Sequence, residues 1–294
     1  MRRKILQACG LKGERRALPA ALLQALDGDD ETRQVALRTL GRLGGDRSRE
    51  VLQLMLVEPG SDFRMTAVEA LADLEDPKVA PVLIALMRQA KEQGIHAPLR
   101  RGLLALGPKA HSALRGSLSS PQPVVRREAA LILGLQDVAR AAPALIRILT
   151  EDPTDTQVAE VLVGLTCVDL LREDERSEAW WGWFDSVIQE DSFSWFLAAC
   201  SARGLNAPLP LGEHFDRARG LQRQPGINPE NTSLTHEGLV FLTQAMQASE
   251  PWLAARAYRE LERLSGRKLG DMPKNLAGRQ VWAEALLDAP VEIR

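Results

Sequence analysis

The aromatic side chains of this chain are its best candidates for contact with a flat ligand, and most of them lie in one short stretch. Seven of the 13 Trp, Tyr and Phe residues fall within the 17 positions from Trp180 to Phe196. Large rings offer stacking surface at low entropic cost, so the cluster could line a pocket for a tetrapyrrole or an extruded base. Its helical spacing beside aliphatic residues favours a hydrophobic core instead. Because Trp180 and Trp181 are adjacent, we expect one of them to face outward, and both are candidate binding residues.

A second candidate group consists of Arg33, Arg64 and Arg126, which are separated by 31 and then 62 residues. Such arginines could form a basic row for an acidic partner. They could equally hydrogen-bond to carboxylates and to loop carbonyls between neighbouring structural repeats. The planar fork of guanidinium donors is well suited to tying helix ends together, so we favour the structural role.

Motifs for catalysis, metal binding or phosphate binding are not evident. The three cysteines are far apart, the four histidines have no zinc-ligand spacing, and Gly41 to Gly45 is not followed by the Lys-Ser or Lys-Thr of a phosphate loop. His236-Glu237 lacks the second His of a zinc-protease helix. We therefore expect no catalytic residue, no metal and no cofactor.

Composition limits the class of protein. The net charge is -2 and the isoelectric point is about 6.2, which makes nucleic acid an unlikely partner. Unpaired cysteines indicate a reducing compartment, and we expect a cytoplasmic location. No window approaches the length of a membrane span, and the short apolar run after Arg2, Arg3 and Lys4 favours a basic first helix over a signal peptide.

The elements that position these residues follow from an internal repeat. The pattern Arg126, Ala129, Leu133, Gly134 recurs 62 residues earlier from Arg64 and 93 residues earlier from Arg33. A copy without the Arg starts at Leu99, after a longer loop through 91–97, and a weaker copy includes Ala159. A period of this length predicts stacked helical pairs that bury their apolar faces against one another.

Caps and breakers divide each unit into a first and a second helix. Asp29 or Asp30 caps a helix that ends at Gly44 and Gly45, and Asp46 caps its partner. In the fourth repeat we expect Ser120 to cap the first helix, with Pro121 at its first position.

The unit with Arg-x-x-Ala-x-x-x-Leu-Gly resembles the short HEAT-like repeat of phycobilisome-lyase-type repeat proteins, and the resemblance covers residues 15–165. It implies an all-α fold, a right-handed α-solenoid of helical pairs with a C-terminal helical extension. Such repeats occur in scaffolds, chromophore lyases, DNA repair enzymes and transport factors, so the resemblance says more about fold than about function.

The second half of the chain contains a weaker duplication with an offset of 99 residues. Leu165-Thr166 precedes Trp183 by the same spacing at which Leu264-Ser265 precedes Trp282, which predicts equivalent core positions for the two Trp residues. This resembles a module of bacterial HEAT-repeat proteins with a Leu-(Thr or Ser)-Gly turn and a downstream Trp, although Cys167 replaces the Gly in the first copy. We expect a repeat array over 1–165, a Trp/Phe-rich helical module over 166–205, an irregular linker or insertion over 206–232 and a helical HEAT-like module over 233–294.

These observations favour a non-enzymatic scaffold or adaptor that binds another protein along the concave surface formed by the second helices. The alternative is an enzyme on a HEAT-like fold, similar to a phycobilin lyase or a DNA glycosylase. The candidate contact residues on the second helices are Arg49, Glu50, Lys78, Arg88, Arg140 and Arg147.

Overall fold

The computed structural model describes residues 2–57, 63–74, 76–89, 96–170, 176–187, 191–208, 234–266 and 268–288, and these residues form helices and connecting turns with no β-strand. The predicted all-α class is confirmed. The helices group into two compact units, unit 1 over residues 1–136 and unit 2 over residues 137–294. The four-part subdivision expected from the sequence stays a prediction, and residues 209–232 of its linker lie outside the described residues. So do residues 91–95 of the expected longer loop, whereas His96 and Ala97 already belong to a helix.

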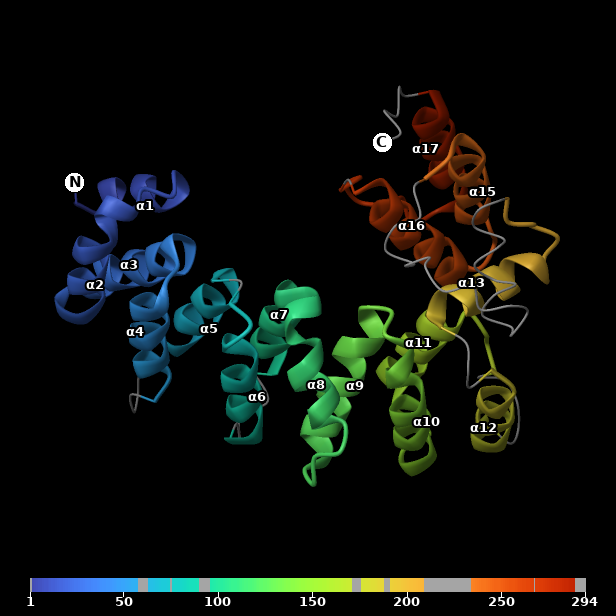
Figure 1. The fold of residues 1–294 in the computed structure, drawn as a ribbon, viewed down its shortest axis with the longest axis horizontal. Helices are drawn as coiled ribbons and strands as arrows, with labels where there is room; N and C mark the ends of the chain where they lie inside the picture. Colours follow the sequence, from blue (N-terminus) through green and yellow to red (C-terminus); the bar gives the residue numbers. More distant parts are fainter. Residues whose placement is uncertain are drawn as a thin grey trace, which may run out of the picture. The chain divides into compact units, whose positions relative to one another are not determined.

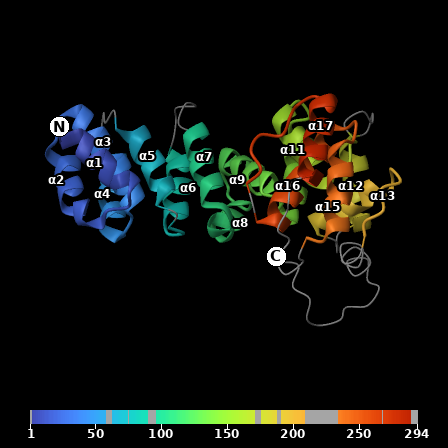
Figure 2. The ribbon, with the colours of Figure 1, turned by 90° about the horizontal axis from the view of Figure 1, so that it is seen from above.

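Unit 1 is a stack of paired helices, as the repeat predicts. It comprises α1 (Arg2–Leu11), η1 (Arg15–Ala17), α2 (Leu18–Asp27), α3 (Asp30–Leu43), α4 (Asp46–Val57), α5 (Arg64–Asp73), α6 (Val79–Gln89), α7 (His96–Leu106), η3 (Gly107–Ala110), α8 (His111–Ser117) and α9 (Pro123–Leu135). The first helices α3, α5, α7 and α9 pack one against the next. The second helices α4, α6 and α8 follow one another on the other side of the stack (Figures 1 and 2).

Small residues allow the first helices to approach closely. A Cβ atom added at Gly41 of α3 would lie 2.5 Å from the backbone oxygen of Ala70 and 2.9 Å from its Cα atom. A Cβ atom at Gly102 of α7 would lie 3.3 Å from the Ala72 Cβ atom. The recurring small residue of the repeat therefore marks the point where one first helix touches the next.

The predicted caps are partly confirmed. Asp29 is the N-cap of α3, because its carboxylate accepts a hydrogen bond from the Thr32 backbone N–H at 2.8 Å. Ser120 does not cap α9, which begins at Pro123 with Gln122 as its N-cap residue. The residue before a proline is held in extended conformation, and Gln122 has φ −87° and ψ 117°, so the helix starts later than predicted.

The structural role favoured for the repeated arginines is confirmed at two of the three positions. Arg33 Nη2 donates to the carbonyl of Leu26, and Arg126 Nη1 donates to the carbonyl of Ser120 at 2.9 Å. Each therefore ties its helix to the chain segment immediately before it. The buried Nε atom of Arg64 has no hydrogen-bond partner in the part of unit 1 that the structure describes.

A buried carboxylate adds an inter-repeat tie that the sequence pattern did not reveal. Glu128 of α9 is 3% exposed, and Arg100 of α7 donates to both of its carboxylate oxygens at 2.6 Å. A bidentate pair of this kind fixes the register of the two helices.

Unit 2 contains η4 (Ala139–Ala141), α10 (Ala142–Glu151), α11 (Thr156–Thr166), α12 (Arg176–Val187), α13 (Ser192–Ser201), α15 (His236–Met246), α16 (Pro251–Ser265) and α17 (Leu276–Asp288). Displacing α11 and α12 by 99 residues gives 255–265 and 275–286, close to the bounds of α16 and α17. In each half the first helix packs against the other two, α10 against α11 and α12, and α15 against α16 and α17. The duplication inferred from the sequence is therefore a duplication of a three-helix module.

The turns that end α11 and α16 have the same backbone conformation. Gly266 has φ 67° and ψ 13°, and Cys167 has φ 59° and ψ 26°, so a cysteine adopts the left-handed conformation in which the second module has glycine. The substitution of Cys for Gly therefore leaves the geometry of the first turn intact. The two Trp residues expected to be core, Trp183 and Trp282, are instead half-buried.

A buried ionic cluster joins α13 and α16 to the start of unit 2. Arg256 is 1% exposed, and its Nη atoms lie 2.6 Å from Asp137 Oδ1 and 2.6 Å from Glu260 Oε1. Asp137, at φ 58°, also accepts two hydrogen bonds from Arg259, and its backbone carbonyl accepts one from Ser192. Pairing and hydrogen bonding offset the cost of taking these charges out of water, and they fix how these elements pack.

Candidate functional site: a Trp-lined pocket and a second-helix surface

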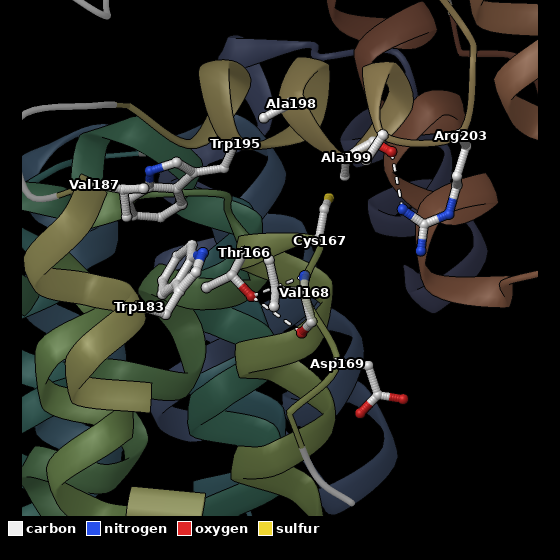
Figure 3. Close-up of a pocket in the computed structure, with 11 residues that line it drawn as sticks. Thr166, Cys167, Val168, Asp169, Trp183, Val187, Trp195, Ala198, Ala199 and Arg203 are labelled. Carbon is white, nitrogen blue, oxygen red and sulfur yellow. Dashed lines mark hydrogen bonds between the residues drawn. The ribbon is translucent and has the colours of Figure 1, made fainter. Parts of the chain in front are cut away.

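A pocket of about 320 Å³ lies in unit 2 between the end of α11, α12 and α13. Its lining consists of Thr166, Cys167, Val168, Asp169, Trp183, Val187, Trp195, Ala198, Ala199, Ala202 and Arg203. Figure 3 shows the Trp183 and Trp195 rings on one side of the pocket and Arg203 on the other, with Cys167 between them. Apolar walls with a few polar groups at the rim are typical of small binding pockets.

The Trp rings of the pocket are held by one another. The centroid of Trp183 lies 5.2 Å from that of Trp195 and 5.8 Å from that of Trp180, both in edge-to-face geometry. Trp180 is 1% exposed, whereas Trp181 is half-buried and contacts Phe184. Neither member of the adjacent pair proposed from the sequence lines the pocket. The aromatic cluster therefore supplies core through Trp180 and pocket wall through Trp183 and Trp195.

The Arg203 side chain is held in place by contacts within the protein. Its Nε atom donates to Glu250 Oε1 at 2.6 Å, its Nη1 atom donates to the carbonyl of Ala199 at 2.9 Å, and its guanidinium lies 5.1 Å from the Trp252 ring centroid. The hydrogen bonds from Arg203 and Ser249 lower the pKa of Glu250. The Arg203 guanidinium is thereby fixed at the edge of the pocket.

The thiol in the pocket is not activated. Burial raises the pKa of Cys167 to about 12, and it also raises the pKa of Cys200, on the adjacent α13, to about 12. The thiolate is the nucleophilic form of cysteine, so both side chains are protonated and unreactive at neutral pH. Cys167 therefore supplies no nucleophile to this pocket at neutral pH.

The second helices of unit 1 carry a separate set of exposed side chains. On α4 these include Arg47, Glu50 and Leu54, on α6 they are Pro81, Ala85 and Arg88, and on α8 they include Ser112 and Arg115. Within each helix these residues are three or four positions apart, so they share one face. We call these residues the second-helix surface.

The residues predicted from the sequence on this side of unit 1 have different roles. Glu50 and Arg88 are exposed and belong to the second-helix surface. Arg49 is half-buried and ion-paired with Asp46 at 2.6 Å and with Asp76 of the next repeat, so it joins two repeats. Lys78 is exposed and precedes α6, with its Nζ atom 3.8 Å from Asp46.

The two remaining predicted residues, Arg140 and Arg147, belong to unit 2. Arg140 lies in η4 and Arg147 in α10, and both are exposed. Whether they act with Arg88 stays a prediction.

Sequence reasoning missed the pocket-lining Trp195 and Arg203 and the surface residues Arg47 and Arg115. The aromatic density signalled the first of these, because Trp195 is in the cluster. Nothing in the repeat pattern singles out Arg203. Arg47 and Arg115 could have been found by writing the second helices on a helical wheel together with Arg88.

In the described residues no group of three or more His, Cys, Asp or Glu side chains is arranged to hold a metal ion. Within the same residues, no helix is both long and apolar enough to cross a bilayer.

Comparison with known proteins identifies the repeat. Residues 18–103 match the family model described as HEAT repeats. A search of curated proteins gives no significant match. Among solved structures, the complex of CpcE and CpcF of phycocyanin lyase from Nostoc sp. PCC7120 is similar, with 19% identity, a TM-score of 0.35 and coverage of 75% of this chain and 89% of that chain.

An engineered protein is also similar, with 16% identity, a TM-score of 0.34 and coverage of 84% of this chain and 68% of that chain. Both identities are low, so the assignment rests on the family match and on the stacked helical pairs of unit 1. The chain is therefore an all-α protein with HEAT repeats over residues 18–103.

Proposed function

We propose that this protein is a non-enzymatic scaffold or adaptor that binds another protein through the second-helix surface of unit 1. The observation that carries the proposal is the run of exposed side chains along α4, α6 and α8, which are successive second helices of the repeat stack. Stacked repeats present such side chains at regular intervals, so a partner can contact several of them at once. We further propose that it acts in the cytoplasm, where the free thiols of Cys9, Cys167 and Cys200 remain reduced.

The enzyme alternatives receive less support. A glycosylase-like role requires aromatic or apolar side chains beside a basic surface to hold an extruded base. Phe63 is the sole aromatic residue of positions 1–136, and it is 7% exposed and therefore buried in the fold. A lyase-like role would use the pocket of unit 2 as its ligand site together with a client protein, and the Ala202 variant described below tests it.

Site-specific photo-crosslinking tests the proposal. A photo-reactive amino acid replaces Ala85 of α6 in one variant and Glu69 of α5 in a matched control, since both positions are exposed but lie on second and first helices respectively. A third variant carries it at Ala202, at the rim of the pocket. After irradiation in lysate of the source organism, we expect an identified protein to be crosslinked to the Ala85 variant and not to the Glu69 variant.

Crosslinking from Glu69 or Ala202 with none from Ala85 would place the contact elsewhere and refute the proposed surface. The scaffold role would be contradicted if no protein were crosslinked from any of the three positions, or if only a small molecule were crosslinked.

A further inference from the structure

The two units of this protein have opposite charge balance, although the whole chain is nearly neutral. Residues 1–136 contain 21 Lys and Arg against 15 Asp and Glu, whereas residues 137–294 contain 16 against 24. The overall net charge of -2 hides this separation. Unit 1 taken alone is a basic protein, and its partners should be considered on that basis.

The positive charge of unit 1 reaches the second-helix surface. Arg47, Arg88 and Arg115 are exposed on α4, α6 and α8, one on each successive second helix. None of the three makes an ion pair within the described part of unit 1. The exposed acidic residues of α4 are Glu50 and Asp46, and Asp46 is paired with Arg49. Among the described residues of unit 1, these three guanidinium groups are therefore not held in ion pairs.

Some other basic side chains of unit 1 are already ion-paired within the protein, so they have a structural role and do not belong with Arg47, Arg88 and Arg115. Arg49 is bound between Asp46 and Asp76, and these hydrogen bonds raise its pKa. Arg100 is bound to the buried Glu128. Arginines that are already ion-paired hold neighbouring repeats together. Exposed arginines without such a pair can attract the negative charges of another molecule.

The side chains around the row favour a polypeptide over a nucleic acid. Proteins that bind single strands combine basic side chains with aromatic platforms for the bases. Unit 1 has no exposed aromatic side chain among its described residues, because its single aromatic residue, Phe63, is buried. The apolar residues of the surface are aliphatic: Pro81, Ala85 and Leu54, of which Leu54 is large and 53% exposed.

We infer that the partner bound by the second-helix surface is an acidic polypeptide segment, whose carboxylates pair with Arg47, Arg88 and Arg115. This inference rests on the proposed function, because it names the chemistry of the partner at the same surface. Guanidinium groups bind carboxylates through paired hydrogen bonds. Because each arginine lies on a different second helix, a segment that contacts all three must be extended and carry several acidic residues.

The test uses the full-length protein and a fluorescein-labelled synthetic peptide of alternating Glu and Gly, with binding followed by fluorescence anisotropy. A Lys and Gly peptide and a DNA duplex serve as the other two probes. We expect the Glu peptide to bind with an affinity that falls as salt is raised, and the Lys peptide not to bind. The R47E/R88E/R115E variant should bind the Glu peptide about tenfold more weakly, which corresponds to about 1.4 kcal/mol, because three attractive contacts become repulsive.

The matched control is R38E/R42E/R101E, which makes the same charge change at exposed positions of the first helices α3 and α7. Its affinity should stay within about twofold of wild type, because exposed charges beyond about 8 Å are screened at physiological ionic strength. Circular dichroism melts of both variants verify that they are folded.

Equal weakening by the two variants would refute the row as the binding site. Tight binding of the duplex with no binding of the Glu peptide would replace the acidic polypeptide with a nucleic acid. If photo-crosslinking from Ala85 identifies a partner while the Glu peptide does not bind, the scaffold role stands and the acidic nature of the partner is wrong.

Discussion

At the scale of single residues, burial separates the three cysteines by reactivity. Cys9 is half-buried, whereas Cys167 and Cys200 lie in the core of unit 2 with thiol pKa values raised to about 12. At pH 8 almost none of a thiol with that pKa is thiolate, so alkylation must wait for local unfolding. We expect iodoacetamide to label Cys9 first in the native protein and to label all three cysteines at once in denaturant, as measured by mass spectrometry of tryptic peptides. Native labelling of Cys167 at the rate of Cys9 would contradict its burial.

The pair at the edge of the pocket gives a second prediction. Hydrogen bonds from Arg203 and Ser249 lower the pKa of Glu250, so the folded carboxylate is favoured over its unfolded counterpart. The associated stability is present above the unfolded pKa of about 4.3 and is lost as pH falls through the lower folded value. In an NMR titration, Arg203→Gln should raise the midpoint of Glu250 towards the ordinary value, whereas Arg140→Gln, at an exposed residue, should leave it unchanged. An unchanged midpoint in Arg203→Gln would mean that the pair does not form in solution.

At the scale of helices, the close approach of α3 and α5 gives the most specific prediction. Gly41→Ala places a methyl group against the backbone of Ala70, and backbone cannot move aside as a side chain can. We expect a loss of about 1–3 kcal/mol in the free energy of unfolding, typical of overpacking. The control is Gly116→Ala in α8, where the added Cβ meets no atom within 4 Å.

The control should be neutral or stabilising by up to about 1 kcal/mol, because Ala has the higher helix propensity. Denaturant unfolding measures both variants. Equal stability of the two would show that the contact between α3 and α5 is looser than the structure indicates.

Helices and repeats were predictable because their signals are local. The period of 31 residues, the Asp29 cap and the small residue at Gly41 each depend on the neighbouring sequence or on a simple repeat of it. The predicted start of α9 at Pro121 was wrong, because a second proline, Pro123, holds Gln122 in extended conformation and the helix begins after it. The duplicated module in unit 2 was also predictable, since its offset of 99 residues preserves a turn and a Trp.

The pocket was not predictable in the same way. Its walls bring Thr166 at the end of α11 together with Trp183 of α12 and Arg203 after α13, and only the packing of these elements decides which side of each ring is covered. The sequence shows that aromatic residues are concentrated between Trp180 and Phe196. It does not show that Trp180 is buried while Trp183 is half-buried. Periodicity identifies a buried face, whereas the pocket depends on contacts between segments distant in sequence.

At the scale of the whole molecule, charge is separated between the two units, and a calculation of net charge over the full chain conceals it. The sequence-based judgement that nucleic acid is an unlikely partner used that overall value. For unit 1 the stronger argument is the lack of an exposed aromatic residue among the described positions, since its charge alone would suit either an acidic polypeptide or a phosphate backbone.

The uneven distribution of aromatic residues also makes the protein its own optical probe. All six Trp residues lie at or beyond position 180 and belong to unit 2, whereas unit 1 contains neither Trp nor Tyr. Intrinsic fluorescence therefore reports the melting of unit 2 alone, while far-ultraviolet circular dichroism reports helix in both units. Gly41→Ala should shift the dichroism curve and leave the fluorescence curve in place if the units unfold independently. Coincident shifts would reveal a single cooperative transition, and neither measurement requires a label.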